Sequence, residues 1–279
     1  MINLIAEIGS NHAGDISLAK EMICAAAENG ADYAKFQSWR EEDIPPGPWD
    51  DKEKFFHFDN KRAFYKQAQL SNEEHYELIS TCKKVGIKFL TTCFNFDRIN
   101  FLSQLNIDTI KVASCDSTNQ KMIKNLNEKF KRVIVSTGMT NNKEIDQITE
   151  LVDPSRLVLM HCVSIYPTPL EKISLPRLND IRKKTKAKGC SFGISDHSIG
   201  INFSLTAVTQ GATWVERHFT IDKRLTGPDN KMSVLPEELK TIKSFSEDFD
   251  KLNACDRADC WEQEIEFRKI ASRRFKDSE

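Results

Sequence analysis

The sequence contains no apolar run that approaches the roughly 20 residues of a membrane-spanning helix. Its formal net charge is -1, which gives no sign of attraction to nucleic acid or to an anionic membrane. The first residues, MINLIAEIG, enter a strand-like pattern without the basic segment and apolar core of a signal peptide. We therefore expect a cytoplasmic protein without a nucleic-acid or membrane partner.

CxxC pairs are also absent, although the sequence has 8 cysteines. Zinc sites and redox pairs usually show such close spacing, and several of these cysteines lie inside apolar segments. We therefore expect reduced, buried thiols rather than disulfides or a zinc site. The cysteines are Cys24, Cys82, Cys93, Cys115, Cys162, Cys190, Cys255 and Cys260.

A glycine-rich nucleotide loop is missing as well, because the glycines of AEIGSNHAG do not have the GxGxxG spacing. The sequence does contain short apolar runs, each ending in a polar or ionisable residue and separated from the next by helical periodicity. This alternation predicts a (β/α)8 barrel as a single domain over 1–279, with a doubly wound open sheet as the alternative. The runs are LIAEIG (4–9), YAKFQS (33–38), KFLTTC (88–93), TIKVAS (109–114), RVIVSTG (132–138), LVLMHCV (157–163), SFGISDH (191–197) and WVERHFT (214–220).

Helices are predicted in the intervals between these runs. A capping box at Ser71 and Glu74 predicts the start of one helix, and Pro236 predicts the start of another. The other predicted helical segments are 16–30, 95–105, 119–128, 141–152, 175–187 and 199–210. The connection 39–70 is unusually long for a barrel, which is typical of a lid over the pocket or of a subunit contact. The charged tail 254–279 predicts a last amphipathic helix through Trp261, Ile265, Phe267 and Ile270.

The polar residues that end the apolar runs are the candidates for chemistry. In a closed parallel barrel the carboxyl ends of all strands lie on one rim, where barrel enzymes place their active sites. These side chains should therefore converge on a single pocket. They are Glu7, Lys35, Thr92, Lys111, Ser136, His197 and His218.

His197 and His218 end two neighbouring predicted strands. Two neutral imidazoles at adjacent strand ends can hold one divalent ion and leave positions open for water and substrate. Asp196 and Glu216 lie close to them in the sequence. A metal site and an ordinary structural role remain equally open from the spacing alone.

The other histidines that we consider have weaker signals. His161 also ends a predicted strand, but Cys162 and Val163 follow it, which favours a structural or hydrogen-bonding role. His57 falls in the long connection and His75 on a helix face, so we expect both on the surface.

Lys35 and Lys111 lie inside apolar strands, where a charged amine is costly unless it meets an anion. Anion binding is the favoured interpretation, and a Schiff base with a carbonyl substrate or an ion pair with Glu7 or Asp116 remains open. Near two lysines, Glu7 would be ionised and able to accept a proton or hold a sugar hydroxyl. Hydroxyls that suit a phosphate or carboxylate cluster at the ends of strands three to five, at Thr91, Thr92, Ser114, Ser136 and Thr137.

Taken together and in order, these motifs resemble the N-acetylneuraminate (sialic acid) synthase family, from about residue 4 to residue 275. The resemblance implies a barrel enzyme that joins phosphoenolpyruvate to an amino-sugar aldehyde and releases phosphate. It also implies a divalent metal, Mn²⁺ before Mg²⁺ or Co²⁺, and a homodimer. The motifs are AEIGSNHAG, GADYAKFQS, FLTTCF, IKVASCD, IVSTGM, LMHCVSIYPTP, GISDHSIG and ERHFTIDKRLTGPD.

The resemblance assigns roles position by position. Glu7 matches the family's catalytic glutamate, and His197 and His218 match its metal ligands. The residues that match the family's phosphoenolpyruvate contacts are Lys35, Thr92, Lys111, Ser114 and Ser136, with Ser195 as a further candidate. Sugar-acceptor contacts match Gln37, Tyr166 and Asp229, and Asp116 stands among the substrate-binding residues where the family commonly has a glutamate.

Family members usually continue into a small antifreeze-like domain that reaches over a partner subunit's pocket. The sequence ends at RRFKDSE, about where that domain would start, so we expect the barrel domain alone. The expected function is metal-dependent condensation of phosphoenolpyruvate with an N-acetylmannosamine-like aldehyde, giving a nonulosonic acid for carbohydrate biosynthesis. The alternatives are a lysine Schiff-base aldolase and a non-catalytic sugar-phosphate-binding barrel.

Overall fold

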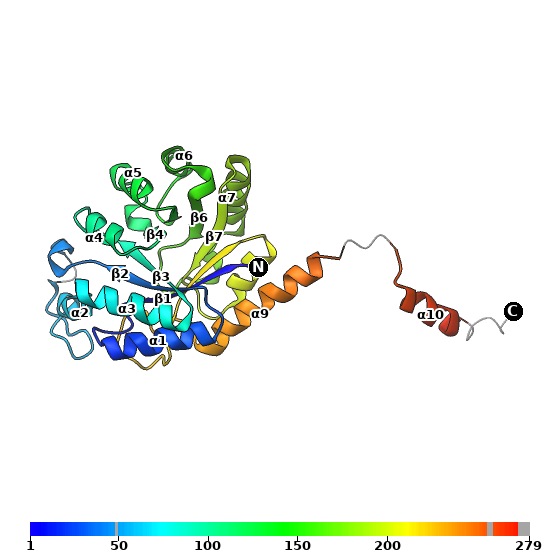
Figure 1. Ribbon diagram of the computed structural model, residues 1–279, viewed down its shortest axis with the longest axis horizontal. Helices are drawn as coiled ribbons and strands as arrows, with labels where there is room; N and C mark the ends of the chain where they lie inside the picture. The colour runs from blue at the N-terminus through cyan, green and yellow to red at the C-terminus, as the bar shows by residue number, and fades with distance from the viewer. Residues whose placement is uncertain (48–49, 256–258, 273–279) are drawn as a thin grey trace.

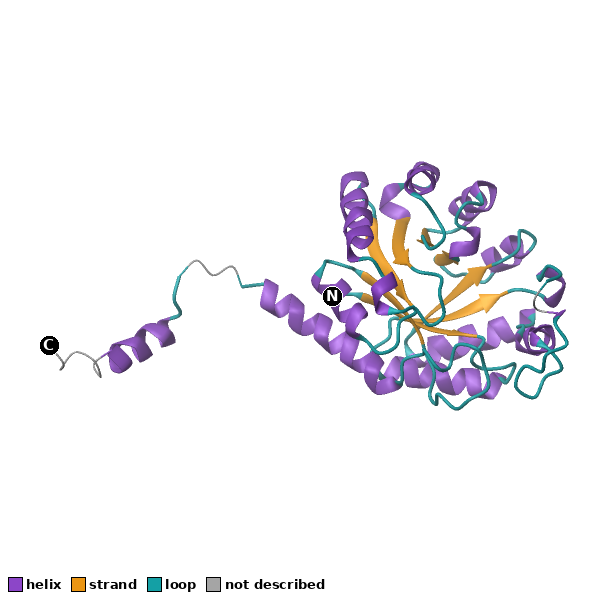
Figure 2. Cartoon of the chain, turned by 180° about the vertical axis from the view of Figure 1, so that it is seen from behind, coloured by secondary structure: helices purple, strands orange, loops and turns teal. Residues whose placement is uncertain are grey.

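The computed structural model describes residues 1–47, 50–255 and 259–272. Its strands close into a parallel barrel in chain order, and helices lie around the outside (Figures 1 and 2). The predicted (β/α)8 barrel is therefore confirmed. The strands are β1 (Asn3–Gly9), β2 (Tyr33–Ser38), β3 (Lys88–Cys93), β4 (Thr109–Val112), β5 (Arg132–Ser136), β6 (Leu157–Cys162), β7 (Ser191–Asp196) and β8 (Trp214–His218).

The outer helices follow the predicted segments within a few residues. They are α1 (Ile16–Glu28), α3 (Asn72–Val85), α4 (Arg98–Gln104), α5 (Gln120–Lys129), α6 (Asn142–Leu151), α7 (Leu175–Lys188), α8 (Asn202–Thr209) and α9 (Pro236–Asn253). Ser71 and Glu74 form the predicted capping box at the start of α3, which satisfies backbone N–H groups that have no partner within the helix. Most of the apolar core lies between these helices and the outer face of the barrel.

The barrel interior has two layers that share the same strand faces. The lower layer is one buried apolar cluster, made of Ile5, Tyr33, Leu90, Ile134, Val158, Met160 and Trp214. Because side chains alternate across a strand, residues two positions further along point into the barrel again. Most of those residues are polar, for example Glu7 after Ile5 and Lys35 after Tyr33, whereas Met160 after Val158 belongs to the apolar cluster. In the lower layer Gly193 makes room for Trp214, since a Cβ at Gly193 would lie 2.7 Å from the Trp214 Cβ.

The connection 39–70 is not one continuous loop. It contains a 3₁₀ turn, η1 (Glu41–Asp43), and a helix that the sequence reading missed, α2 (Lys61–Ala68). The Asn60 side chain caps α2 by accepting a hydrogen bond from the Ala63 N–H. The segment has an apolar cluster of its own, made of Trp39, Phe58, Phe64 and Ala68. These long-range apolar contacts stabilise a helix too short to form by itself.

The structure corrects two predictions of burial. His75 is buried rather than on the surface, with its ring 5.3 Å from that of Phe101 and its Nδ1 2.7 Å from the Ser71 carbonyl. His57 is exposed, as predicted. Among the cysteines, which are all free, Cys115, Cys255 and Cys260 are exposed, because they lie in a 3₁₀ turn and in the segment after α9.

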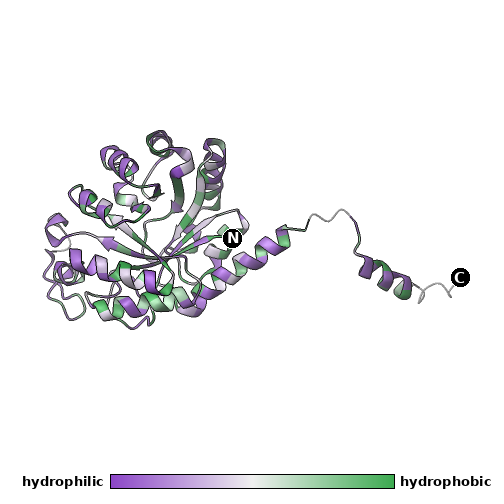
Figure 3. Ribbon diagram, viewed as in Figure 1, coloured by the Kyte–Doolittle hydropathy of each residue, from purple (hydrophilic) through white to green (hydrophobic). Residues whose placement is uncertain are grey.

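The tail contains α10 (Glu262–Ala271), which confirms the predicted last helix. Residues 256–258 and 273–279 of the predicted tail lie outside the described residues. Within the described part of the chain, no helix is both long and apolar enough to cross a membrane. Figure 3 accordingly shows hydrophilic and hydrophobic residues mixed along the outer helices.

Candidate active site

A cavity of about 450 Å³ opens at the carboxyl ends of the strands, and we call it the reaction cavity. Strand pairing brings its residues to one level, because Glu7 is in register with Lys35 of β2 and with His218 of β8. The predicted residues that line it are Glu7, Lys35, Gln37, Thr92, Lys111, Ser114, Ser136, Tyr166, Ser195, His197 and His218. The predicted convergence on one pocket is therefore observed for these side chains.

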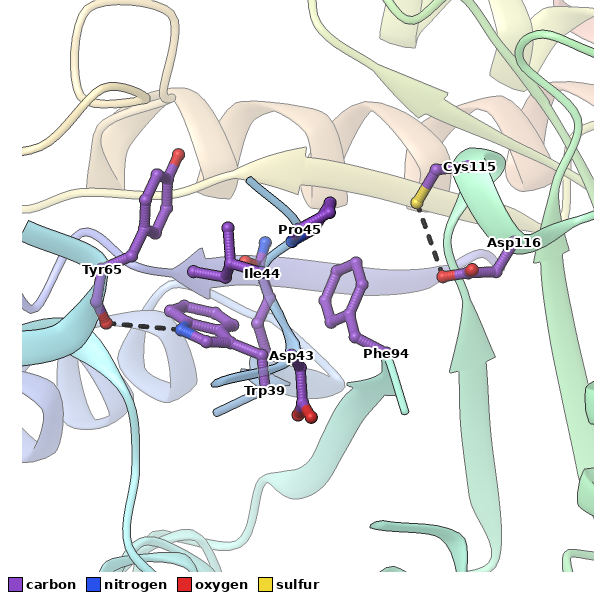
Figure 4. A pocket seen from close by; sticks show the side chains of 9 residues that line it. Trp39, Asp43, Ile44, Pro45, Tyr65, Phe94, Cys115 and Asp116 are labelled. Carbon is purple, nitrogen blue, oxygen red and sulfur yellow. Dashed lines mark hydrogen bonds between the residues drawn. The ribbon is translucent and has the colours of Figure 1, made fainter. Parts of the chain in front are cut away.

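Two predicted residues lie outside this lining. Asp229 lies next to His218, and its Oδ2 is 3.6 Å from the His218 Nδ1. Burial raises the pKa of Asp229 to about 6, against the opposing charges of His197 and Lys35. Asp116 lines a neighbouring cavity of about 540 Å³ instead, which we call the side cavity (Figure 4).

Two lysines and two carboxylates form a buried charge network at the floor of the reaction cavity. The Lys35 Nζ lies 2.5 Å from the Glu7 Oε2 and 3.6 Å from the Glu216 Oε1. The Lys111 Nζ lies 3.1 Å from the same Glu216 oxygen, which also accepts a hydrogen bond from the Ser195 hydroxyl at 3.1 Å. Glu216 is thus the centre of the network, although the sequence reading noted it only as a neighbour of His218.

This network decides the charge of its members. Burial by itself would raise the pKa of Glu216, but Lys111 and Lys35 hold it at about 2. For the Lys35 amine, burial by itself would lower the pKa, but the negative charges of Glu216 and Glu7 raise it above its ordinary value. Lys35 is therefore a charged amine, which suits an anion site and not the neutral nucleophile of a Schiff base.

Of the two lysines expected near Glu7, only Lys35 forms an ion pair with it. Lys111 pairs with Glu216 instead. The other oxygen of Glu7 accepts a hydrogen bond of 2.6 Å from the Gln37 amide. Burial raises the pKa of Glu7, Lys35 opposes that shift, and the negative charge of Glu216 adds to it. Glu7 is thus the carboxylate of the pair that is closer to exchanging a proton.

The two histidines face each other, with ring centroids 5.4 Å apart. The His197 Nδ1 lies 2.9 Å from the Val163 carbonyl and donates to it, which leaves the Nε2 lone pair free for a ligand. Burial, together with the charges of His197 and Lys35, lowers the pKa of His218 well below its ordinary value. Burial opposes protonation of His197 too, but Cys162 and the Val163 carbonyl raise its pKa.

These observations bear on the metal that the resemblance implies. His218 is a buried neutral imidazole, and its Nδ1 makes no hydrogen bond within the described structure. The second carboxylate oxygen of Glu216 is also buried without a hydrogen-bond partner there. No group of three or more His, Cys, Asp or Glu side chains among the described residues could enclose a metal ion. The residues present therefore fit an open two-histidine site, with the other positions left to water and substrate.

The predicted cluster of hydroxyls divides into two groups. Thr91 and Thr137 donate to backbone carbonyls, which is a structural role. Thr92, Ser114 and Ser136 line the cavity, and the buried Ser136 hydroxyl has no hydrogen-bond partner in the described structure. A buried hydroxyl without a partner, in a cavity that two lysines also line, is a position where a bound oxyanion would complete the hydrogen bonding.

His161 has the structural role that its sequence context favoured. It is buried, and its Nε2 lies 2.8 Å from the carbonyl of Ile173, two residues before α7. Burial lowers the pKa of His161 to about 4, so the ring is a neutral hydrogen-bonding group near neutral pH. It does not line the reaction cavity.

Comparison with known proteins agrees with the resemblance read from the motifs. The sequence model of the NeuB family matches residues 22–254. The chain is 34% identical to an N,N'-diacetyllegionaminic acid synthase of Campylobacter jejuni, over 86% of this chain and 73% of that protein. It is 32% identical to an N-acetylneuraminate-9-phosphate synthase of Drosophila melanogaster, over 89% of this chain and 68% of that protein.

A solved structure with a similar fold is the N-acetylneuraminic acid (sialic acid) synthetase from Leptospira borgpetersenii, determined in complex with citrate. Its TM-score with this chain is 0.81 at 30% sequence identity. The match covers 100% of this chain and 93% of that one. The similarity therefore includes the whole barrel and its rim.

Proposed function

This chain belongs to the NeuB family of synthases, and on that premise we propose that it condenses phosphoenolpyruvate with the open-chain aldehyde of an amino sugar. The products would be a sialic-acid-like nonulosonic acid and inorganic phosphate. The observation that carries the proposal is the reaction cavity itself, where two buried lysines, several hydroxyl groups (that of Ser136 without a partner among the described residues) and two facing imidazoles surround one space.

Phosphoenolpyruvate would occupy the side of the cavity formed by β2 to β5 and β7. Lys35 and Lys111 are buried and paired with carboxylates, and their amino groups could also bind a trianion. The hydroxyls of Thr92, Ser114 and Ser136 provide neutral donors at the same rim. Holding both anionic ends fixes the methylene carbon toward the histidines, which lowers the entropic part of the barrier.

His197 and His218 would hold the divalent cation, which we propose to be Mn²⁺ in preference to Mg²⁺ or Co²⁺. When bound, such an ion supplies Lewis-acid polarisation of the aldehyde oxygen. The chain positions the imidazoles for this role through the bond from the His197 Nδ1 to the Val163 carbonyl. Asp229 lies beside the His218 Nδ1 and would orient the second ring.

The proposed reaction balances with one water molecule. The methylene carbon of phosphoenolpyruvate attacks the aldehyde carbon, and the aldehyde oxygen gains a proton to become a hydroxyl. Water adds to the former enol carbon with loss of a proton, and phosphate then leaves by cleavage of its C–O bond, which gives the 2-keto acid. Glu7 lies between Lys35 and Gln37 and has a raised pKa, so it is the group best placed to move these protons.

The direct test is phosphate release by the purified protein from phosphoenolpyruvate, Mn²⁺ and N-acetylmannosamine or a diacetamido hexose. Phosphoenolpyruvate labelled with oxygen-18 at the bridging position should transfer the label to the released phosphate. Label retained in the sugar acid would exclude C–O cleavage. Absence of any phosphate release across a panel of aldoses would reject the condensation.

The Schiff-base alternative has its own test, because borohydride would trap an adduct between a carbonyl substrate and a lysine. We expect no such adduct, since Lys35 is paired with two carboxylates. The homodimer implied by the resemblance is also a proposal. Light scattering of the purified protein in solution would test it.

A further inference from the structure

We propose that the side cavity binds the part of the acceptor sugar remote from its aldehyde. We further infer that this part is unphosphorylated and carries an apolar substituent, such as a methyl or acylamino group. The inference rests on the proposed function, since it assumes that the aldehyde lies in the reaction cavity.

The first argument is that the two cavities share walls. Gln37, Phe94 and Cys115 line both of them. The Gln37 amide also donates to the Glu7 carboxylate at 2.6 Å, so the shared wall begins beside a predicted catalytic group. A sugar whose aldehyde lies near the histidines can therefore extend past Gln37 into the side cavity.

The second argument is the apolar character of the walls. Figure 4 shows aromatic and aliphatic side chains around the side cavity, namely Trp39, Ile44, Pro45, Tyr65 and Phe94. The Trp39 ring is held in place, because its Nε1 donates to the Tyr65 carbonyl at 3.3 Å and its ring lies edge-on to Tyr65 and Phe94. Fixed apolar walls with a few polar groups favour burial of a methyl or acyl group.

The third argument is the sign of the charge. The two ionisable carboxyl groups of the side cavity are Asp43 and Asp116, and its described lining has no lysine, arginine or histidine. The nearby arginines already have partners: Arg40 is paired with Glu42, Arg62 is paired with Asp50, and Arg98 donates to Ser38 and Asn72. A phosphate dianion would meet like charges in this lining without a cation among the described lining residues, whereas sugar hydroxyl and amide N–H groups could donate to the two aspartates.

This distinction matters because the relatives are named for products both with and without a phosphate. The test measures turnover of three acceptors by the purified protein with phosphoenolpyruvate and Mn²⁺. The acceptors are N-acetylmannosamine, its 6-phosphate and a 2,4-diacetamido-2,4,6-trideoxyhexose. We expect kcat/KM for the trideoxy diacetamido sugar to exceed that for the 6-phosphate by at least about tenfold. Equal or better turnover of the 6-phosphate would overturn the inference and leave the condensation itself intact.

A substitution in the wall of the side cavity tests whether this cavity is responsible for the acceptor preference. Ile44→Ala removes part of the apolar wall from a half-buried position in the connection 39–70, away from the charged residues of the reaction cavity. Because each lost methylene contact weakens apolar binding several-fold, we expect KM for the diacetamido sugar to rise about tenfold and KM for phosphoenolpyruvate to stay unchanged. Ile265→Ala, in α10 and outside both cavities, is the matched control and should change neither value. An unchanged acceptor KM in Ile44→Ala would count against the side cavity.

Binding can be measured without turnover, which separates failure of this inference from failure of the proposed function. The probe is the alditol of the diacetamido sugar, which has no aldehyde and cannot react. Saturation-transfer NMR should show the strongest contact at its methyl protons, and Ile44→Ala should weaken that contact. Strong methyl saturation without phosphate release would support the side cavity and reject the condensation, whereas no methyl saturation would reject the side cavity.

Discussion

The upper and lower layers of the barrel interior are formed by the same strands and have opposite chemistry. The lower layer is a continuous apolar cluster that contains Leu90 and Trp214. The upper layer, two residues further along β1, β2 and β8, contains Glu7, Lys35 and Glu216 in one network of buried charges. The inner face of these strands therefore carries both a buried apolar cluster and the site.

The comparison teaches that the two layers have separate energetic roles. Burial of the lower layer stabilises the fold by roughly 25 cal/mol for each Å² of apolar surface removed from water. The upper layer buries charges that repay their desolvation only through mutual pairing. Variants in the upper layer should therefore lose activity, with an added loss of stability where they leave a buried charge unpaired. Variants in the lower layer should lose stability and keep their activity while folded.

Replacing either histidine of the reaction cavity gives the largest expected effect. His197→Ala and His218→Ala should each reduce metal-dependent phosphate release by more than about 1,000-fold, because each would remove one of the two proposed imidazole ligands. Their thermal unfolding should stay cooperative. His57→Ala, an exposed histidine outside the cavity, should retain full turnover. Substantial Mn²⁺-dependent activity in both cavity variants would contradict the proposed role of these histidines.

Much of this upper layer could be predicted from the sequence, since each apolar run ends in a polar residue at the rim. Glu216 was undervalued because its partners, Lys35 and Lys111, lie on strands far away in the sequence. The alternation of side chains could have found it, because Glu216 precedes His218 by two residues and must face the same way.

Other features depended on tertiary contacts that no local pattern records. Helix α2 forms because Phe64 and Ala68 pack against Trp39 and Phe58. The side cavity likewise combines residues from β2, α2 and the segments that follow β3 and β4. Such combinations become visible only when the chain is folded.

In the lower layer, Leu90→Ala is expected to cost about 3 kcal/mol of unfolding free energy, since Leu90 is fully buried and its truncation leaves a cavity. Urea denaturation would measure this loss. Below the unfolding transition, kcat and both KM values should stay close to those of the parent protein. Leu252→Ala, at a position 76% exposed, is the control and should leave stability within about 0.5 kcal/mol. Loss of turnover in a folded Leu90→Ala variant would show that the layers are coupled.

Lys111→Met sharpens the comparison inside the upper layer. The substitution keeps the apolar stem and removes the charge, so KM for phosphoenolpyruvate should rise about 30-fold, as expected for one lost charge-assisted hydrogen bond. KM for the sugar should change far less. Lys131→Met, on an exposed lysine paired with Asp108, is the matched control. A selective loss of sugar affinity would contradict the placement of phosphoenolpyruvate beside β4.

The smallest effect concerns a buried ionisable group that belongs to neither layer. His75 lies on the buried face of α3, where burial lowers its pKa to about 4, while the unfolded chain keeps an ordinary histidine value near 6.5. The unfolded state therefore binds a proton that the folded state excludes, so the stabilisation is fully present above pH 6.5 and is lost as the pH falls toward 4. Between pH 6 and pH 5 this single group should lower the unfolding free energy by about 1 kcal/mol. His75→Gln should remove that part of the pH dependence in urea denaturation, and His57→Gln should leave it unchanged, because His57 is exposed in the folded protein. An identical pH slope in His75→Gln and the parent protein would mean that the ring takes up its proton while folded.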